Sequence, residues 1–444
     1  MYGCQSHMLG HKVKVFITGC SHRGEGLGRL PSGQIIFIPY ALPGEEVECQ
    51  VTEVKRDYAR GRLEKIVAPS PHRIEPACPV FYTCGGCHLQ HAAYPLQLEI
   101  KRRQVEEALL RLGKLQGYTL KPVLGMDWPW RYRNKVHLHV GKINETLRLG
   151  LYQERSHELV DTRDCLLLPE DMVKIWQILE EEGIPHIQEK GLYGALLRKS
   201  FSTGEIMVGL VGYQDLCPEG RLFQNLLNYG ASSIVQILPG NGLKVLAGQK
   251  YLWEEIGPCR FRLSPTSFFQ VNPRQAAKIY EIVLDYASLT GKETVIDIYS
   301  GTGTIALFLA PRASKVYGLE VSEEALADAR ANAQENKAKN VSFLWGPAER
   351  SLPRLLEKGT KAEVIVLDPP RQGCHPRVLE TVARSRPRRL IYVSCYPATL
   401  ARDLQYLSCQ GYWIKEVQPV DMFPQTHHIE CVALLLPKDN RKSK

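Results

Sequence analysis

The residues with the clearest chemistry lie in segment 391–404, Ile-Tyr-Val-Ser-Cys-Tyr-Pro-Ala-Thr-Leu-Ala-Arg-Asp-Leu. Its apolar, β-rich start ends at Ser394-Cys395, and Pro397 with the amphipathic stretch after it predicts that a helix begins at once. Cys395 should therefore lie at the carboxyl end of a strand, where open α/β sheets bind ligands. Its thiol is a candidate nucleophile, because a helix N-terminus and the cation of Arg402 would both lower its pKa. The alternative is a buried structural cysteine.

A glycine turn between two buried strands predicts a nucleoside-cofactor site. Residues 294–299 read as an apolar strand, Ser300-Gly-Thr-Gly-Thr304 is the turn, and a second strand, 315–320, ends in Glu320. Glycines allow a ligand to approach the backbone closely, and an acid in this place can accept two hydrogen bonds from a ribose diol. The spacing differs from the Gly-x-Gly-x-x-Gly of pyrophosphate binding, so S-adenosylmethionine, which has no phosphate, fits better than NAD.

Two more acids stand where strands meet loops. Asp368-Pro-Pro-Arg371 follows a third buried strand, and paired prolines make the loop rigid, so this carboxylate could orient a cofactor or a flat base. Glu430 stands where a later strand enters the sheet. With a reference pKa of about 4.3 it should be ionised and able to accept a proton.

A cysteine cluster predicts a metal site. The chain has 13 cysteines, an odd number, and a reducing compartment makes disulfides a poor explanation. Cys78, Cys84 and Cys87 fall close together, and bringing three thiolates so near is costly unless a metal neutralises them. Cys165 is the best candidate for a fourth ligand. By spacing alone, the metal could be zinc or an iron-sulfur cluster.

The elements around these residues suggest three domains. Residues 12–67 read as short strands separated by turns, at the spacing of a small antiparallel barrel, with basic and aromatic residues interleaved. We expect a barrel over 10–68, a β-rich central domain with the metal cysteines over 75–260, and a Rossmann-like catalytic domain over 261–444. A helix over 94–115 could pack on the catalytic domain.

Several segments resemble known families. Gly24 to Leu30 and Pro39 to Gly44 are similar to the TRAM module, an RNA-binding β-barrel. Asp368-Pro-Pro-Arg371, the segment around Cys395, and Phe423-Pro-x-Thr-x-His-x-Glu430 resemble the class I RNA (uracil-5-)-methyltransferases. With the barrel and the four cysteines included, the resemblance covers nearly the whole chain and favours the members that modify 23S ribosomal RNA.

The resemblance implies a role for each of these residues. Cys395 would add to C6 of uracil, C5 would take the methyl group of S-adenosylmethionine, and Glu430 would remove the C5 proton. Gln270, Tyr299, Glu320 and Asp368 match donor-binding positions, and Cys78, Cys84, Cys87 and Cys165 match ligands of a [4Fe-4S] cluster. A splayed target base needs a stacking partner, for which Phe269 is a candidate.

The sequence departs from the family pattern at two places. Ser300 stands where the family commonly has Cys, and Tyr396 stands where it commonly has Asn. The first change lies in a turn. The second lies beside the proposed nucleophile and could alter contacts with the base.

The partner we expect is RNA, and the rival functions are few. A net charge of +9 suits a polyanion, no apolar run reaches the about 18 residues of a spanning helix, and no signal-peptide core is present, so we expect a cytoplasmic monomer. The alternatives are a tRNA uracil-5-methyltransferase, a cytosine-5-methyltransferase with Cys374 as nucleophile, and a non-catalytic RNA-binding protein.

Overall fold

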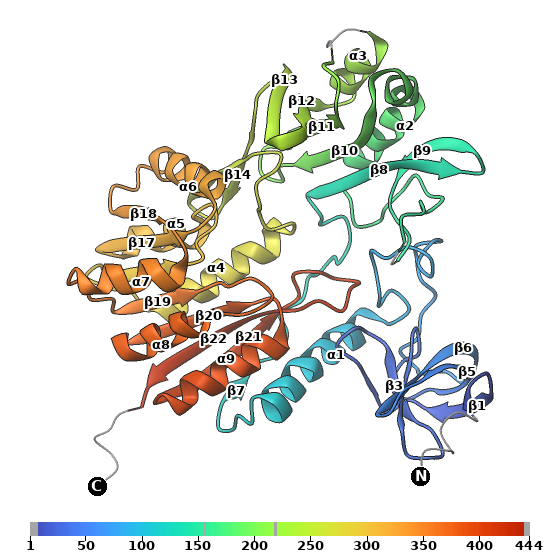
Figure 1. Cartoon of the computed structure of the whole chain (residues 1–444), viewed down its shortest axis with the longest axis horizontal. Coiled ribbons are helices and arrows are strands. Elements are labelled where there is room, and N and C mark those ends of the chain that lie inside the picture. The colour runs from blue at the N-terminus through green and yellow to red at the C-terminus, as the bar shows by residue number, and fades with distance from the viewer. Residues whose placement is uncertain (1–7, 155, 217–219, 439–444) are drawn as a thin grey trace.

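The N-terminal part of the chain folds as a small β-barrel. The computed structural model describes residues 8–154, 156–216 and 220–438 (Figure 1). Six strands form the barrel sheet in the order β1-β5-β6-β4-β3-β2: β1 (Lys12–Phe16), β2 (Gly19–Cys20), β3 (Gly26–Arg29), β4 (Ile35–Ile38), β5 (Glu46–Val54) and β6 (Tyr58–Ala68). Its neighbours are antiparallel except β4 and β6. The expected turns at Gly33 and Gly44 are present, with φ of 82° and 87°, a conformation that favours glycine.

One long helix connects the barrel to the rest of the protein. Helix α1 (Tyr94–Glu107) continues into a π-helical turn, η2 (Ala108–Leu112). Val105, Leu109 and Leu115 share a buried cluster with side chains of helix α9 (Pro397–Cys409). Figure 1 shows α1 between the barrel and the C-terminal sheet. This helix therefore packs on the element that follows Cys395.

The central part contains a mixed sheet covered by helices. Its strands lie in the order β13-β12-β11-β10-β8-β9, and only β11 and β12 are parallel. The elements are β8 (Lys135–Ile143), β9 (Thr146–Gly150), α2 (Glu170–Lys190), β10 (Leu192–Lys199), β11 (Ile206–Gly212), α3 (Arg221–Asn228), β12 (Ala231–Leu238), η3 (Pro239–Asn241) and β13 (Gly242–Ala247). The sequence pattern predicts mainly strands and turns here, and it does not predict helices α2 and α3. A hairpin, β14 (Leu252–Ile256) and β15 (Cys259–Leu263), leads to the next sheet.

The C-terminal part is an eight-stranded sheet in the order β18-β17-β16-β19-β20-β22-β21-β7. Strands β18 to β20 are parallel, and β22 pairs antiparallel with both β20 and β21. The elements are β7 (Thr119–Leu120), α4 (Pro273–Ala287), β16 (Thr294–Ile298), α5 (Thr304–Leu309), η4 (Ala310–Arg312), β17 (Lys315–Glu320), α6 (Glu323–Glu335), β18 (Val341–Trp345), α7 (Ala348–Glu357), β19 (Val364–Leu367), α8 (Pro376–Ser385), β20 (Arg389–Ser394), α9, β21 (Tyr412–Val420) and β22 (Glu430–Pro437). The predicted Rossmann-like layout is present.

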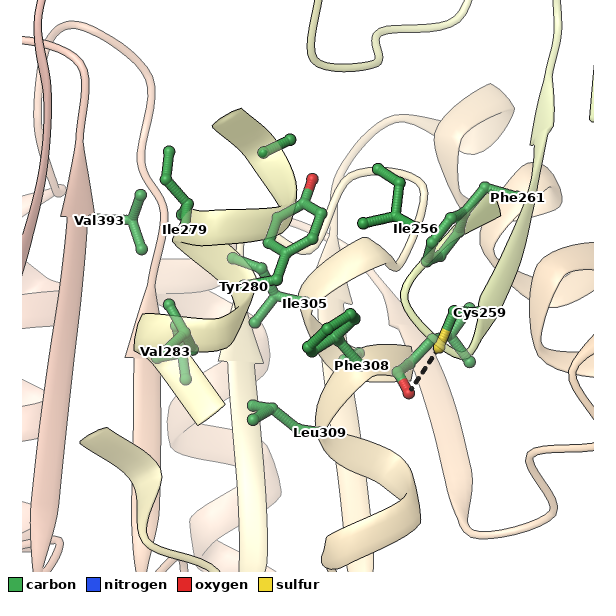
Figure 2. Close-up of a cluster of buried hydrophobic side chains, with 14 of the residues drawn as sticks. Ile256, Cys259, Phe261, Ile279, Tyr280, Val283, Ile305, Phe308, Leu309 and Val393 are labelled. Atoms are coloured by element: carbon green, nitrogen blue, oxygen red, sulfur yellow. Dashed lines mark hydrogen bonds between the residues drawn. The ribbon is translucent and has the colours of Figure 1, made fainter. Parts of the chain in front are cut away.

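Alternate residues of each central strand enter two different cores. Val295 and Val393 belong to the cluster on one face of the sheet, whereas Ile296 and Tyr392 belong to the cluster on the other. Figure 2 shows the first cluster, where Tyr280 of α4 lies near the ring of Phe308. Because both faces of the strands are buried, their carboxyl ends are held rigidly along one edge.

Candidate active site

The glycine turn lies at the end of β16, as its sequence predicts. Gly303 has φ of 82°, and a Cβ added there would meet Phe343 Cζ at 2.6 Å, so a larger residue would not fit. Tyr299 has φ of 68°, which is rare for a non-glycine residue and marks a strained backbone at a candidate functional position. Glu320 accepts hydrogen bonds from the amide of Gly301 at 2.8 Å and from that of Ser322 at 2.7 Å. The backbone around the turn thus fixes this carboxylate at the sheet edge.

Three carboxyl groups gather beside this turn, two of them buried and that of Asp368 half-buried. Burial raises the pKa of Asp297 to about 8, with a further contribution from Asp368, and raises that of Asp368 to about 7. Glu430 is 5% exposed, and burial together with Asp368 raises its pKa well above the usual value. Asp297 Oδ2 accepts from the amide of Ala306 at 3.1 Å, whereas its Oδ1 has no partner. This edge of the sheet is therefore suited to a positively charged ligand.

The structure corrects the predicted charge state of Glu430. The sequence argument used a reference pKa and expected an ionised carboxylate. The side chain begins β22 in the interior, where burial favours the protonated form. Arg371 is the group that acts in the opposite direction. Positive charge bound nearby would act in the same direction as Arg371 and favour the ionised form of Glu430.

Cys395 lies between β20 and α9, but its electrostatic environment also differs from the prediction. Burial, then Glu430 and Asp368, raises the pKa of its thiol to about 11, and Arg371 is the cation that lowers it. Arg402 instead donates to Asp403 Oδ1 at 2.7 Å and to the carbonyl of Gln372 at 3.0 Å. The expectation that Arg402 activates Cys395 was wrong, because Arg402 is engaged in that ion pair.

Cys395 opens into a cleft of about 700 Å³ between three parts of the chain. The catalytic part contributes Arg371, Cys395, Tyr396, Pro397, Ala398, His427, His428 and Ile429; the barrel contributes Cys20, Ser21, His22, Arg23, Leu27, Ile35 and Phe37; α1 and η2 contribute Gln104, Glu107, Ala108, Arg111 and Leu112. The cleft is rich in apolar and cationic side chains. Such a surface suits unstacked bases and phosphates.

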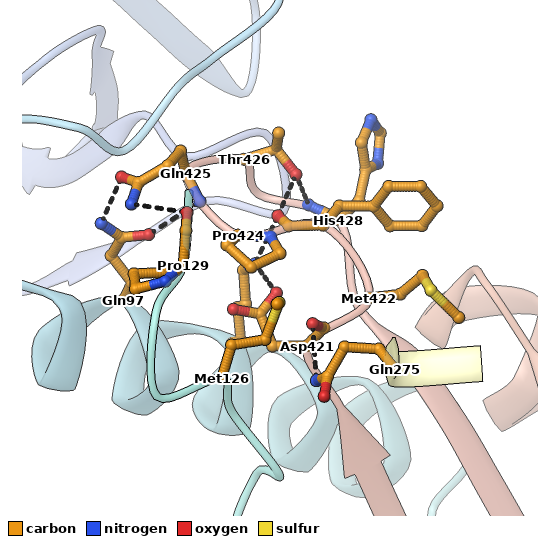
Figure 3. A network of polar contacts seen from close by, with 12 residues as sticks. Gln97, Met126, Pro129, Gln275, Asp421, Met422, Pro424, Gln425, Thr426 and His428 are labelled. Atoms are coloured by element: carbon orange, nitrogen blue, oxygen red, sulfur yellow. Dashed lines mark hydrogen bonds and ion pairs between the residues drawn. The ribbon is translucent and has the colours of Figure 1, made fainter. Parts of the chain in front are cut away.

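The loop that leads to Glu430 is fixed by polar contacts, shown in Figure 3. Gln97 Nε2 donates to Gln425 Oε1 at 2.9 Å, and Gln275 Nε2 donates to the carbonyl of Asp421 at 2.9 Å. Lys101 forms an ion pair with Asp421 and also donates to the carbonyl of Phe423 at 3.0 Å. Residues 421–428 are thus positioned by α1 and α4.

Sequence reasoning missed Lys101 and Gln97. Both lie on the buried side of α1, at helical spacing with Val105. The available signal was that these two polar residues occupy the same helical face as apolar residues. A charge on a buried face requires a partner elsewhere in the chain, so this pattern predicts an ion pair.

The aromatic residue proposed for base stacking, Phe269, is buried in the core, whereas its neighbour Phe268 is exposed. Phe269 is 3% exposed and packs near Phe261, with ring centroids 6.0 Å apart. Phe268 is 73% exposed. Gln270 is half-buried, and its carbonyl accepts from Asn134 Nδ2 at 3.2 Å. Phe268 is therefore the accessible ring of this segment.

Cys374 does not lie in a position to act as a nucleophile. It is buried, with 4% exposure, and does not line the cleft that Cys395 opens into. Burial also raises the pKa of its thiol. The arrangement disfavours the cytosine-5-methyltransferase alternative.

The four cysteines predicted to bind a metal line one small cavity of about 130 Å³, together with Arg133 and several apolar residues. The amide of Gly86 donates to Cys84 Sγ at 3.4 Å. Burial raises the pKa of the Cys165 thiol to about 11, and a hydrogen bond from the backbone amide of Leu167 lowers it by a smaller amount. Across residues 8–154, 156–216 and 220–438, no three His, Cys, Asp or Glu side chains are arranged to hold a single metal ion. The donor set and the amides directed at sulfur nevertheless suit a larger thiolate-bound group.

The largely parallel sheet, the glycine turn at the end of β16 and the N-terminal barrel are the arrangement of a Rossmann-like methyltransferase preceded by an RNA-binding barrel. Comparison with protein families matches residues 204–438 to the tRNA (uracil-5-)-methyltransferase family and residues 7–63 to the TRAM domain. The chain belongs to this family of RNA (uracil-5-)-methyltransferases. The predicted family, the barrel and the assignment as an enzyme are confirmed.

Relatives agree over nearly the full length. The chain is 43% identical to an uncharacterized RNA methyltransferase of Halalkalibacterium halodurans, covering 95% of this chain and 96% of the relative. It is 42% identical to another from Clostridium tetani, covering 96% and 97%. The crystal structure of Pyrococcus abyssi tRNA (uracil-54, C5)-methyltransferase in complex with S-adenosyl-L-homocysteine matches with a TM-score of 0.72 at 26% identity, covering 96% of this chain and 100% of that one. In the described part of the chain, no helix has the length and apolar character needed to cross a membrane.

Proposed function

We propose that this protein is a cytoplasmic, monomeric enzyme that methylates uracil C5 in 23S ribosomal RNA, with S-adenosylmethionine as methyl donor. The main observation behind this proposal is that Cys395 opens into a cleft with cationic and aromatic side chains and interacts electrostatically with Asp368, Arg371 and Glu430. A thiol nucleophile beside a carboxyl group that can exchange a proton is what addition to uracil requires.

The chain provides a fitting place for the donor. Gly301 leaves the backbone of the turn open, Glu320 is fixed beside it, and Asp297 Oδ1 lacks a partner. We propose that Gln270, Tyr299, Glu320 and Asp368 hold the donor, as the family resemblance implies. Bound S-adenosylmethionine would supply the methyl group and carries positive charge. Burial and the neighbouring carboxyl groups of Glu430 and Asp368 raise the pKa of Cys395, so positive charge bound beside it would lower that pKa.

The residues then have complementary tasks. Cys395 Sγ forms a bond to C6 of the uracil ring, which makes C5 electron-rich and ready to accept a methyl group. Glu430 takes the proton from C5, the Sγ–C6 bond breaks, and the thiolate is restored. Arg371 lies where its cation favours the ionised forms of both Cys395 and Glu430. The protein thus uses one nucleophile and one base with a shared cation.

We further propose that Cys78, Cys84, Cys87 and Cys165 bind a [4Fe-4S] cluster with a structural role. These cysteines line one cavity, and its site contacts the segment after Trp130 that also reaches the catalytic loop: Tyr132 Oη donates to the carbonyl of Pro424 at 3.0 Å. A cubane cluster separates its thiolates more widely than one ion does, which is compatible with the observed arrangement.

A tRNA substrate is the second candidate, favoured by the family description and by the name of the Pyrococcus abyssi enzyme. Mass spectrometry of 23S ribosomal RNA and tRNA from cells with and without the gene separates the two. Loss of 5-methyluridine from ribosomal RNA alone supports the proposal. Loss from tRNA alone supports the second candidate. No loss from either RNA, with purified enzyme also inactive on both, would favour a non-catalytic RNA-binding protein.

A further inference from the structure

The barrel loop Ser21–Glu25 is held firmly at both ends. The carbonyl of Ser21 accepts from Gln104 Nε2 of α1 at 2.9 Å, and the Ser21 hydroxyl donates to Glu25 Oε2 at 3.1 Å. Glu25 Oε1 in turn pairs with Arg60 Nη1 at 2.6 Å. The loop is therefore anchored both to the barrel and to the helix that packs on the catalytic part.

The middle of the same loop lies against the catalytic loop. Gly24 has φ of 82°, and a Cβ there would lie 3.5 Å from His427 Cβ and 3.6 Å from His88 Cβ. His22 and Arg23 are exposed and line the cleft with Cys395. Two barrel side chains thus project into the space above the nucleophile.

His22 contacts the residue next to the nucleophile. The rings of His22 and Tyr396 are arranged edge to face, with centroids 6.5 Å apart. Burial, and then Arg23, lowers the pKa of His22, so its imidazole is neutral near pH 7. Tyr396 is also where this sequence departs from the family pattern. The two nearly perpendicular rings form a corner between the barrel and the segment of Cys395, with a face of either ring available to a base.

We propose that His22 is a specificity-determining residue: together with Tyr396 it holds the RNA nucleotide that flanks the target uridine. The inference rests on the proposed function, since it needs RNA at Cys395. A cleft of about 700 Å³ exceeds the space of one pyrimidine ring. Beside the pair, Leu27 and Phe37 offer apolar surface to a base, and Arg23 offers a cation to its phosphate.

The test measures methylation of 23S ribosomal RNA transcripts by wild-type enzyme and single variants. His22→Ala should raise KM for RNA by about tenfold with little change in kcat, the scale expected for one base–aromatic contact. His22→Phe, which keeps a flat ring, should restore most of the affinity. His11→Ala removes another exposed barrel histidine that does not line the cleft, so it should match wild type.

A second measurement addresses selectivity. A transcript with the bases beside the mapped uridine changed should be a poorer substrate for wild type, and His22→Ala and Tyr396→Asn should both reduce that discrimination. Wild-type enzyme that methylates RNA while both variants keep full discrimination would overturn the inference and leave the proposed function intact. Wild type inactive on all RNA would overturn the proposed function and this inference with it.

Discussion

Lys101 Nζ lies 2.5 Å from Asp421 Oδ1, and neither side chain has exposed surface. Tyr94 Oη also donates to Asp421, at 2.8 Å. The pair joins a helix near the N-terminal barrel to the loop that ends at Glu430, across more than 300 residues of sequence. The position of the loop before Glu430, the proposed base, therefore depends on an element outside the catalytic sheet.

Breaking this pair should cost both stability and activity. Lys101→Met leaves Asp421 buried without its cation, a change that typically costs about 3–5 kcal/mol. Arg103→Met is the matched control, because its partner Glu99 is on the exposed face of the same helix and such pairs contribute about 0.3–0.5 kcal/mol. Denaturant unfolding and hydrogen exchange of residues 421–430 report the effect. Equal losses in the two variants would show that the buried pair has no special role.

Replacing the proposed base should trap the reaction midway. In Glu430→Gln the thiol can still add to the uracil, but the C5 proton is not removed, so a covalent protein–RNA adduct should accumulate. The adduct is detected as a protein band of reduced mobility that nuclease digestion removes. Adding Cys395→Ala to this variant should abolish the adduct. If Glu430→Gln turned over normally, another group would have to be the base.

The reactivity of Cys395 should rise steeply with pH. Its pKa is raised to about 11, so in the protein alone the thiolate fraction keeps increasing above about pH 9. Arg371→Ala removes the cation that lowers this pKa and should slow alkylation by iodoacetamide at about pH 9 by threefold to tenfold.

Peptide mass spectrometry measures the alkylation of Cys395 separately from that of the other cysteines. Arg377→Ala removes an exposed arginine that does not line the cleft of Cys395 and should leave the rate unchanged. A faster reaction in Arg371→Ala would contradict the assigned sign.

The cavity lined by Cys78, Cys84, Cys87 and Cys165 predicts that the purified protein contains iron. Protein purified without oxygen should contain iron and acid-labile sulfide, and Cys84→Ser should lose most of both because it removes one of the four proposed ligands. Cys409→Ser changes an exposed cysteine far along the chain and should retain them. Zinc in place of iron would refute the cluster assignment while keeping a metal site.

Local patterns were sufficient for much of the fold. The barrel strands and the strand–turn–helix around Gly301 were predicted because turn residues and apolar alternation act over a few neighbours. The motifs around Cys395 and Glu430 were likewise visible as short stretches. Helix α2 was missed, because its sequence contains Gly183 and Pro185, residue types that usually mark the end of a helix.

Properties that depend on residues far apart in the sequence could not be predicted from short stretches of it. The pKa of Cys395 reflects burial and the carboxyl groups of Asp368 and Glu430, not the nearby Arg402. The approach of His22 to Tyr396 depends on how the barrel docks on α1. Both follow from packing between domains, for which one sequence contains no periodic signal.

The order of strands has a consequence for biosynthesis. Strand β22 is translated after β21 but lies between β20 and β21, and on its other side β21 pairs with the two-residue β7 and with Leu124. A nascent chain that has not yet released β22 from the ribosome cannot close the sheet, and it lacks Glu430 beside Cys395. Glu430, the residue proposed to release the RNA, therefore reaches Cys395 only after this strand has left the ribosome, so turnover requires the release of β22.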